Sequence, residues 1–295
     1  MKIAEKVALW GILVGVAVIS LKITAWLVSG SVALLSDALE SSVNVSAAVI
    51  AFAAVSFAAV PADSNHPYGH EKVELFAAII EGVLIVLAAL AILYEAVMSI
   101  LHPAPLRLAW DGLAVNLIAT AINLGWSIVL GRTGKSQRSR ALAADAVHLR
   151  ADVVTSIGVT IGVALALVTG YHVLDPIVAA LVALHVLWSG TKVITESVDG
   201  LMDAAPAPAV LARISAVIAG SGMGAIEAHD LKTRATGRWT FLEFHLVVPD
   251  AMTVAAAHDI CDRIEHALMD DMEDLKVTIH VEPAGKAKHE GIEFA

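Results

Sequence analysis

The chain has 295 residues, of which 58% are hydrophobic and only 16% are charged, and its formal net charge is −10. Soluble domains are usually about half apolar and about a quarter charged, so this composition is typical of a membrane protein. The acidic balance argues against nucleic acid as a partner, and the single cysteine excludes an internal disulfide framework and a cysteine-rich zinc site.

The hydrophobic excess lies in the first two-thirds of the chain, in runs as long as the roughly 20 residues that a helix needs to cross a bilayer. Glycine and proline separate most of these runs. We therefore predict a six-transmembrane-helix bundle embedded in lipid over residues 1–204. The expected spans are residues 7–28, 32–58, 73–101, 108–131, 140–169 and 174–199.

Positive charges between the fourth and fifth spans predict the orientation. This loop holds Arg132, Lys135, Arg138 and Arg140, whereas the loops on the opposite side hold only Arg107 between them. The positive-inside rule places the basic loop in the cytoplasm, and with six spans both termini lie there as well. A multi-pass protein of a bacterial inner membrane is the simplest expectation.

The second and fifth spans carry polar pairs with the same spacing. Glu40 and Asn44 stand four residues apart, as do His148 and Asp152, and 108 residues separate each member of one pair from its counterpart. Residues at i and i+4 share a helix face, so two such helices facing each other bring four nitrogen and oxygen ligands around one point. This pattern predicts a tetrahedral cation site inside the membrane.

Of the other acidic residues within the spans, three bear on the predicted ion site or lie deep in a span. Asp37 and Asp145 each stand three residues before one of the polar pairs, where they either orient the ligands or cap their helices. Glu81 lies deep in the third span, and a carboxyl is costly there. It has either a functional role or a hydrogen bond to a neighbouring helix.

The loop after the second span contains Asp63, His66 and His70. Two imidazoles and a carboxylate within eight residues can hold a divalent metal with one or two outside ligands. The alternative is a polar loop with solvated histidines. The run from His70 to Glu74 lacks the second histidine of an HExxH motif, so we do not expect a metalloprotease, nor any other enzyme.

Residues 205–295 read as a soluble α+β domain with the order αββαβ. Cys261 lies in an amphipathic helical pattern there, and we interpret it as a packing residue rather than a thiolate ligand. The expected helices are residues 207–220 and 253–270, and the expected strands are residues 225–234, 239–248 and 275–282.

The predicted soluble domain is rich in histidine. His280 and Glu282 share one face of a predicted strand, and His229 and His245 lie on the neighbouring strands. With His258 they form a candidate metal cluster. Histidines scattered over the surface are the alternative.

Taken together, these motifs resemble the cation diffusion facilitator family, the six-span exchangers of divalent metals for protons. His148 and Asp152 fit the HxxxD pair of this family, and residues 65–74 are similar to its cytoplasmic loop-and-helix signature. The similarity extends over nearly the whole chain. Asp63, His66 and His70 match a loop metal site found in some members.

The resemblance implies a homodimer whose ferredoxin-like, metallochaperone-like tails meet through bound metal. His229, His245, His258 and His280 match positions that ligate this metal pair, and Glu282 stands where those members have aspartate. Residues 205–295 are then a cytoplasmic metal-binding dimerisation domain.

Glu40 and Asn44 depart from the DxxxD or HxxxD pair that this family usually has in the second span. Two carboxylates, one amide and one imidazole form a relatively hard ligand set, so Mn²⁺, Fe²⁺ and Co²⁺ accompany Zn²⁺ as candidates. We expect a secondary transporter that exports a divalent transition metal, with Zn²⁺ favoured, in exchange for protons. The alternative is a membrane-anchored metal sensor or scaffold that binds metal without moving it.

Overall fold

The structure, a computed structural model, describes residues 3–29, 32–101, 110–169, 171, 174–236 and 239–294. The chain divides into two compact units, Met1–Val198 and Asp199–Ala295. Gly30, Ser31, Pro103, Arg107 and Gly170, which lie between predicted spans, fall outside the described residues.

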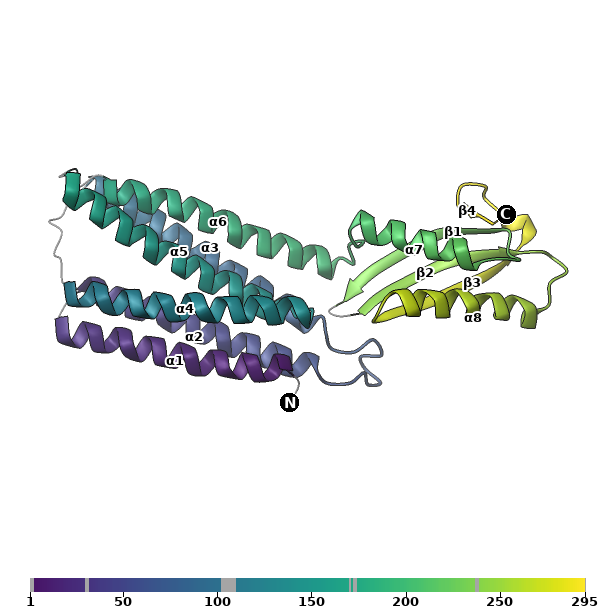
Figure 1. The fold of residues 1–295 in the computed structure, drawn as a ribbon, viewed down its shortest axis with the longest axis horizontal. Coiled ribbons are helices and arrows are strands. Elements are labelled where there is room, and N and C mark those ends of the chain that lie inside the picture. The colour runs from purple at the N-terminus through teal and green to yellow at the C-terminus, as the bar shows by residue number, and fades with distance from the viewer. Residues whose placement is uncertain are drawn as a thin grey trace. The chain divides into compact units, whose positions relative to one another are not determined.

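Six long helices form the first unit (Figure 1). Four of their ends differ from the predicted spans by two residues or more, and the largest difference is at the end of α4. The helices are α1 (Ile3–Ser29), α2 (Val32–Ala58), α3 (Val73–Leu101), α4 (Trp110–Ser136), α5 (Arg140–Thr169) and α6 (Leu174–Leu201).

Helix α4 continues past residue 131, so Arg132 and Lys135 lie on the helix and not in a loop, contrary to the prediction. The turn into α5 is tight because Gly134 has no side chain. A Cβ there would lie 2.9 Å from the Ala143 nitrogen, and the Gly134 carbonyl accepts a 2.9 Å hydrogen bond from the Ser139 amide. The polar sequence of this last turn gave no hydrophobic signal for a helix.

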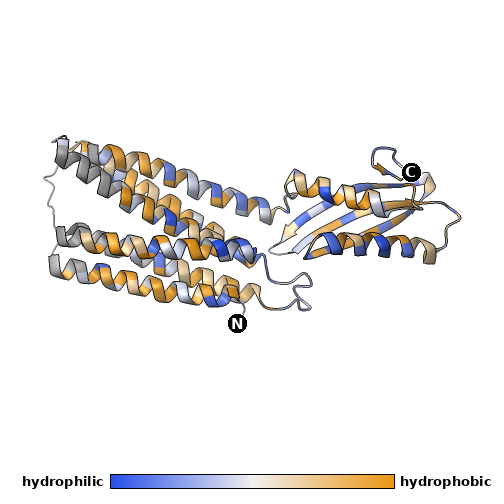
Figure 2. Ribbon diagram, in the orientation of Figure 1, coloured by the Kyte–Doolittle hydropathy of each residue, from blue (hydrophilic) through white to orange (hydrophobic). Residues whose placement is uncertain are grey.

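Three segments of the described chain are long and apolar enough to cross a membrane: Ile3–Thr24, Val73–Leu101 and Pro176–Leu201. Hydrophobic residues extend along much of α1–α6 in Figure 2. This pattern supports a helical membrane domain. The count of six spans remains a prediction.

Small residues allow the helices of this unit to approach closely. Ala8, Ala51 and Ala146 are almost completely buried in one cluster of α1, α2 and α5. On α3 and α6, a Cβ built on either Gly82 or Gly190 would lie 3.2 Å from the carbonyl oxygen of the other. Close contact of this kind is the usual basis of helix association in lipid.

The second unit contains a four-stranded sheet with two helices packed on one face (Figure 1). The strand order is β3-β2-β1-β4, with β1 antiparallel to β2 and β4, and β2 parallel to β3. A fourth strand was not predicted. The elements are α7 (Pro208–Ser221), β1 (Glu227–Thr236), β2 (Trp239–Val248), α8 (Val254–Asp271), β3 (Leu275–Pro283), the short 3₁₀ helix η1 (Ala284–Lys286) and β4 (Ile292–Glu293).

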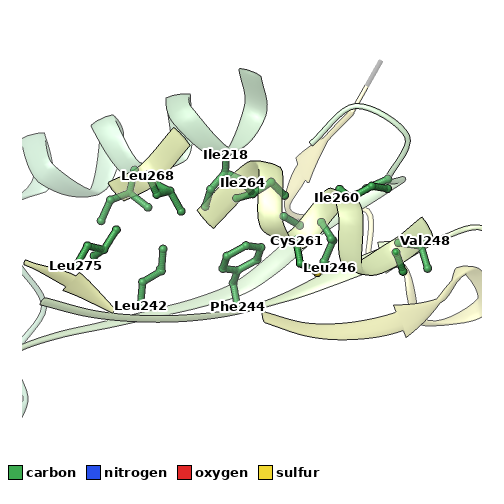
Figure 3. Close-up of a cluster of buried hydrophobic side chains, with 14 residues drawn as sticks. Ile218, Leu242, Phe244, Leu246, Val248, Ile260, Cys261, Ile264, Leu268 and Leu275 are labelled. Carbon is green, nitrogen blue, oxygen red and sulfur yellow. The ribbon is translucent and has the colours of Figure 1, made fainter. Parts of the chain in front are cut away.

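The core of this unit lies between the sheet and its two helices (Figure 3). Alternate residues of β2, among them Leu242, Phe244 and Leu246, point toward α7 and α8, because side chains alternate across a strand. Cys261 of α8 is 6% exposed within this core and is a free cysteine, which confirms its interpretation as a packing residue. The opposite face of the sheet is therefore free to present polar groups.

Candidate metal centres

Asn44 of α2 joins His148 and Asp152 of α5 in the membrane-domain helices. The Asn44 amide nitrogen donates to Asp152 Oδ2 at 2.7 Å, and Asn44 Oδ1 lies 2.8 Å from His148 Nε2. Asn44 and His148 are each 6% exposed. The fourth predicted ligand, Glu40, lies one turn earlier on α2, but its side chain is outside the described residues, as is that of Asp37. The structure thus brings three of the four predicted ligands together.

Asn123 of α4 also belongs to this cluster, although it was not among the predicted ligands. Its amide nitrogen donates to the same Asp152 Oδ2 at 3.3 Å, and its side chain is 5% exposed. An asparagine within an apolar run was the available signal. A cavity of about 10 Å³ adjoins the cluster and is lined by Asn44, Asn123, Trp126 and Asp145, among others, which is room for one water-sized or ion-sized occupant.

Asp145 and Glu81 are buried carboxyls with unsatisfied oxygens. Asp145 is 1% exposed, and its Oδ1 has no hydrogen-bond partner in the described part of the chain. It lies inside α5, more than one turn from the first residue, so it does not cap the helix. Glu81 is fully buried, and neither of its oxygens has a hydrogen-bond partner among the described residues. No helix side chain that the structure describes accounts for Glu81 by a hydrogen bond.

The loop residues Asp63, His66 and His70 form a second cluster, with one ligand atom from each lying within 4.8 Å of the others. His70 Nε2 lies 3.0 Å from His66 Nδ1 and 3.5 Å from Asp63 Oδ2. His70 is 7% exposed, and its ring meets that of Phe57 edge to face. One wall of the cluster is thus fixed by packing on the end of α2.

Backbone amides of the loop hold the side chain of Asp63, the third residue of this cluster, in position. Asp63 Oδ1 accepts hydrogen bonds from the amides of His66 (2.7 Å) and Asn65 (2.9 Å). These amides, led by that of His66, lower the pKa of the Asp63 carboxyl below its ordinary value. An ionised carboxylate next to two imidazoles is a suitable partial ligand set for a divalent metal.

Glu74 ends the run from His70 to Glu74. Its side chain forms hydrogen bonds at the N-terminus of α5. Its Oε2 accepts hydrogen bonds from Ser139 Oγ (2.5 Å) and from the Ala141 amide (3.3 Å). The side chain thus ties the first turn of α3 to the N-terminus of α5, where a carboxylate is favoured by the helix dipole.

The third cluster is centred on Glu282 of β3. Its Oε2 lies 3.3 Å from His229 Nε2, and its Oε1 lies 3.4 Å from His245 Nδ1 and 3.9 Å from His280 Nε2. The strands bring these residues together because β2 pairs His245 with His229 of β1 and with His280 of β3. His229 is 3% exposed, and neither ring nitrogen has a hydrogen-bond partner in the described chain. A buried imidazole whose nitrogens face carboxylates, Nε2 at 3.3 Å from Glu282 and Nδ1 at 3.7 Å from Glu227, without forming a hydrogen bond to either fits a metal ligand.

Asp230 joins this cluster and was absent from the predicted ligands. One ligand atom from each of His229, Asp230 and His245 lies within 4.8 Å of the others. The strand pairing shifts register between His229 and Lys232, and Asp230 has a φ of 53°. This bulge turns the Asp230 carboxylate toward its neighbours. The pKa of the Asp230 carboxyl is lowered, and the largest cause is the hydrogen bond from Lys288.

His258 stands apart from the other tail histidines within one chain. It lies on α8, its side chain is 72% exposed, and its Nε2 is 3.6 Å from Asp262 Oδ1. A role for His258 in the cluster therefore requires a second copy of the chain.

Each cluster combines imidazole with carboxylate, and two of them lie outside the long apolar helices. Neutral imidazole and ionised carboxylate bind divalent transition metals, and both lose their metal when they are protonated. The chain therefore has one candidate ion site between its long helices, a second in the loop after α2 and a third on the sheet of the second unit.

Two family models match the chain. The cation efflux transmembrane domain matches residues 8–202, and the cytoplasmic domain of cation efflux proteins matches residues 206–284. The uncharacterized transporter sll1263 of Synechocystis sp. is 43% identical over 96% of this chain and 91% of its own length. The cation-efflux pump FieF of Salmonella newport is 28% identical over 94% of this chain and 92% of its own length. A solved structure of CzrB in a Zn form is 46% identical over 28% of this chain and 94% of that chain, with a TM-score of 0.27.

Proposed function

Because the chain belongs to the cation diffusion facilitator family of cation efflux proteins, we propose that it exports a divalent transition metal from the cytoplasm in exchange for protons. Zn²⁺ is the favoured substrate, and Mn²⁺, Fe²⁺ and Co²⁺ are the alternatives. The protein acts in the inner membrane with six spans, and both termini are cytoplasmic.

The observation that carries this proposal is the buried contact of Asn44 with His148 and Asp152 across α2 and α5. A polar cluster inside apolar helices is costly unless it serves an ion or a substrate. Glu40, one turn before Asn44 on α2, supplies the fourth ligand. A metal ion entering this site replaces the hydrogen bonds of Asn44 with coordination by its amide oxygen.

Competition between metal and protons at the same side chains couples the two fluxes. Metal binding needs a neutral His148 and ionised carboxylates, so a lower pH on the far side of the membrane releases the ion. Movement of helix groups about a fixed site exposes it to the two sides in turn. No additional coupling device is needed.

The other two clusters fit cytoplasmic metal binding. The matched cytoplasmic domain fits a homodimer, and in this proposal the partner's α8 supplies a histidine to the tail cluster. Asp63, His66 and His70 bind a further ion near the membrane surface. Cytoplasmic metal then tightens the dimer and favours transport, a coupling between distinct sites.

The test uses the full chain reconstituted in liposomes with a trapped pH dye, challenged separately with Zn²⁺, Mn²⁺, Fe²⁺ and Co²⁺. Wild type is compared with Asp152→Ala and with Asp259→Ala, which removes the same charge from an exposed position on α8. We expect proton movement with at least one metal in wild type and Asp259→Ala, and its loss in Asp152→Ala.

No proton movement with any metal, in a protein whose tail still binds ions, would contradict exchange for protons, and no uptake of metal into the same liposomes would contradict transport. That result would favour the membrane-anchored sensor or scaffold, a function for which the histidine cluster around Glu282 already provides the binding groups.

A further inference from the structure

The C-terminal segment, residues 284–294, folds back beside the tail cluster. It leaves β3 through η1 and returns as β4, which pairs with Glu227 and Ala228 of β1. The approach is close, because a Cβ on Gly291 would overlap the carbonyl oxygen of Ala228. Most of this segment lies beyond residue 284, where the match to the cytoplasmic family domain ends.

A single carboxylate holds the backbone of this segment. Glu227 is 1% exposed and accepts hydrogen bonds from four successive amides. Its Oε2 accepts from Lys288 (2.8 Å) and His289 (3.1 Å), and its Oε1 accepts from Glu290 (3.3 Å) and Gly291 (3.0 Å). Residues 288–291 of the C-terminal segment are therefore held next to β1.

This anchoring places the Lys288 ammonium on a residue of the tail cluster. Lys288 Nζ donates to Asp230 Oδ2 at 2.6 Å, and Asp230 Oδ2 lies 3.9 Å from His245 Nδ1. Lys288, Asp230 and His229 all line one open pocket of about 460 Å³. The Asp230 oxygen that lies near the His245 imidazole is thus the oxygen that accepts the hydrogen bond of the Lys288 ammonium.

A metal ion and the ammonium group would compete at this oxygen. An ammonium group offers three donors and no lone pair, so Lys288 cannot act as a ligand. A divalent ion between Asp230 and His245 would also lie within a few ångströms of a like charge. Binding through Asp230 Oδ2 is therefore weakened while Lys288 stays in place, and it is favoured when the ammonium moves away.

We propose that Lys288 is an internal competing cation that sets the metal affinity of the tail cluster. With the metal absent, its ammonium neutralises Asp230. A metal ion that takes Asp230 as a ligand displaces the ammonium into solvent, while Glu227 keeps the backbone of the segment in place. This inference rests on the metal-binding tail of the proposed function. It adds a residue that sets the metal concentration at which the tail cluster becomes occupied.

The expected effect is modest because the pair is half exposed, with side-chain exposures of 47% for Lys288 and 39% for Asp230. Exposed ion pairs are worth little, so the lysine is displaced readily. Its removal should tighten metal binding by roughly fivefold. Lys288 thus adjusts the affinity and does not block the site.

The experiment measures Zn²⁺ binding by the full chain in detergent, in competition with a chromogenic chelator. Asp152→Ala and His70→Ala are present in every variant, so that the signal comes from the tail. Lys288→Met is compared with Lys288→Arg, which keeps the charge, and with Lys286→Met, which removes an exposed lysine from the same segment. We expect tighter binding for Lys288→Met alone.

A structural role for Lys288 would weaken binding upon substitution, so a gain of affinity distinguishes competition from support. Unchanged or weaker binding by Lys288→Met would overturn this inference while leaving the tail site intact. Equal gains for Lys286→Met would also overturn it, since net charge would then explain the effect. A parent protein that binds no Zn²⁺ would overturn the tail site of the proposed function together with this inference.

Discussion

At the scale of single residues, Glu227 is a buried carboxylate that accepts four backbone hydrogen bonds. Burial alone would raise its pKa, but the amides of residues 288–291 lower it, and the net result is a pKa below the ordinary value. A carboxyl with a lowered folded-state pKa stabilises the fold above its unfolded pKa, and this contribution is lost as the pH falls through the lowered value.

We predict that Glu227→Gln releases the C-terminal segment at neutral pH, because an amide nitrogen would face amide donors. Hydrogen exchange at residues 288–291 should accelerate on the order of tenfold or more. In wild type, corrected for intrinsic rates, the protection should hold above the ordinary glutamate pKa of about 4.3 and decline at lower pH. Glu290→Gln, at an exposed position, is the control. Equal exchange in both variants would contradict the prediction.

Single residues also show where sequence reasoning reached its limit. The i, i+4 spacing of His148 and Asp152 was readable because a helix repeats every 3.6 residues. Asp230 was not predicted as a ligand, since its orientation depends on a bulge and a positive φ that period-2 alternation does not reveal. Asn123 was missed because its partner lies on another helix, 29 residues away.

At the scale of elements, the contact between α3 and α6 depends on Gly82. A Cβ at this position would lie 2.7 Å from Ile194 Cγ1 and 3.2 Å from the Gly190 carbonyl oxygen. Backbone cannot yield as a flexible side chain can, so the helices would have to separate.

We predict that Gly82→Val destabilises the membrane unit by about 1–3 kcal/mol, the usual cost of overpacking. The measurement is thermal unfolding in detergent, compared with Gly125→Ala on α4, where an added Cβ meets no atom within 4 Å. The control should be neutral or slightly stabilising, because alanine favours a helix over glycine. An equal loss in both variants would show that the helix contact is not responsible.

Elements with their own periodic pattern were predicted well from the sequence. The helices α3 and α5 begin and end at the predicted residues, and β2 spans residues 239–248 as expected. Strand β4 could not be predicted, because two residues carry no alternation and are held by pairing with β1 and by Glu227. Tertiary contacts, and not local preference, determine such a short strand.

At the scale of the whole molecule, the single cysteine provides a reporter for the tail. Cys261 is the one cysteine among 295 residues and is buried in the core of the second unit. Its reaction with a thiol reagent therefore follows the unfolding of that unit, even in the full chain. Burial, the largest cause, raises the pKa of this thiol, which further slows its reaction in the folded state.

We predict that metal removal by a chelator lowers the temperature at which Cys261 becomes reactive. A ligand at about 100 times its dissociation constant stabilises the folded state by about 2.7 kcal/mol, which corresponds to a shift of about 10 °C or more for a domain of this size. His245→Ala should abolish the metal-dependent shift, whereas His289→Ala, with a 76% exposed side chain, should retain it. A shift that survives in His245→Ala would assign the stabilisation to another site.

The hydrogen bonds of Glu227 all end on main-chain nitrogens of residues 288–291. The anchor thus requires amide hydrogens, which proline lacks, and a glycine at position 291. The side chains at positions 288 and 290 take no part in these hydrogen bonds, whereas position 289 has a φ of 56° and disfavours β-branched residues. Under the proposed competition, a substitution of Lys288 would change the metal affinity of the tail cluster while the sheet, the core and the six long helices stay the same, so this segment is a suitable place for engineering that affinity.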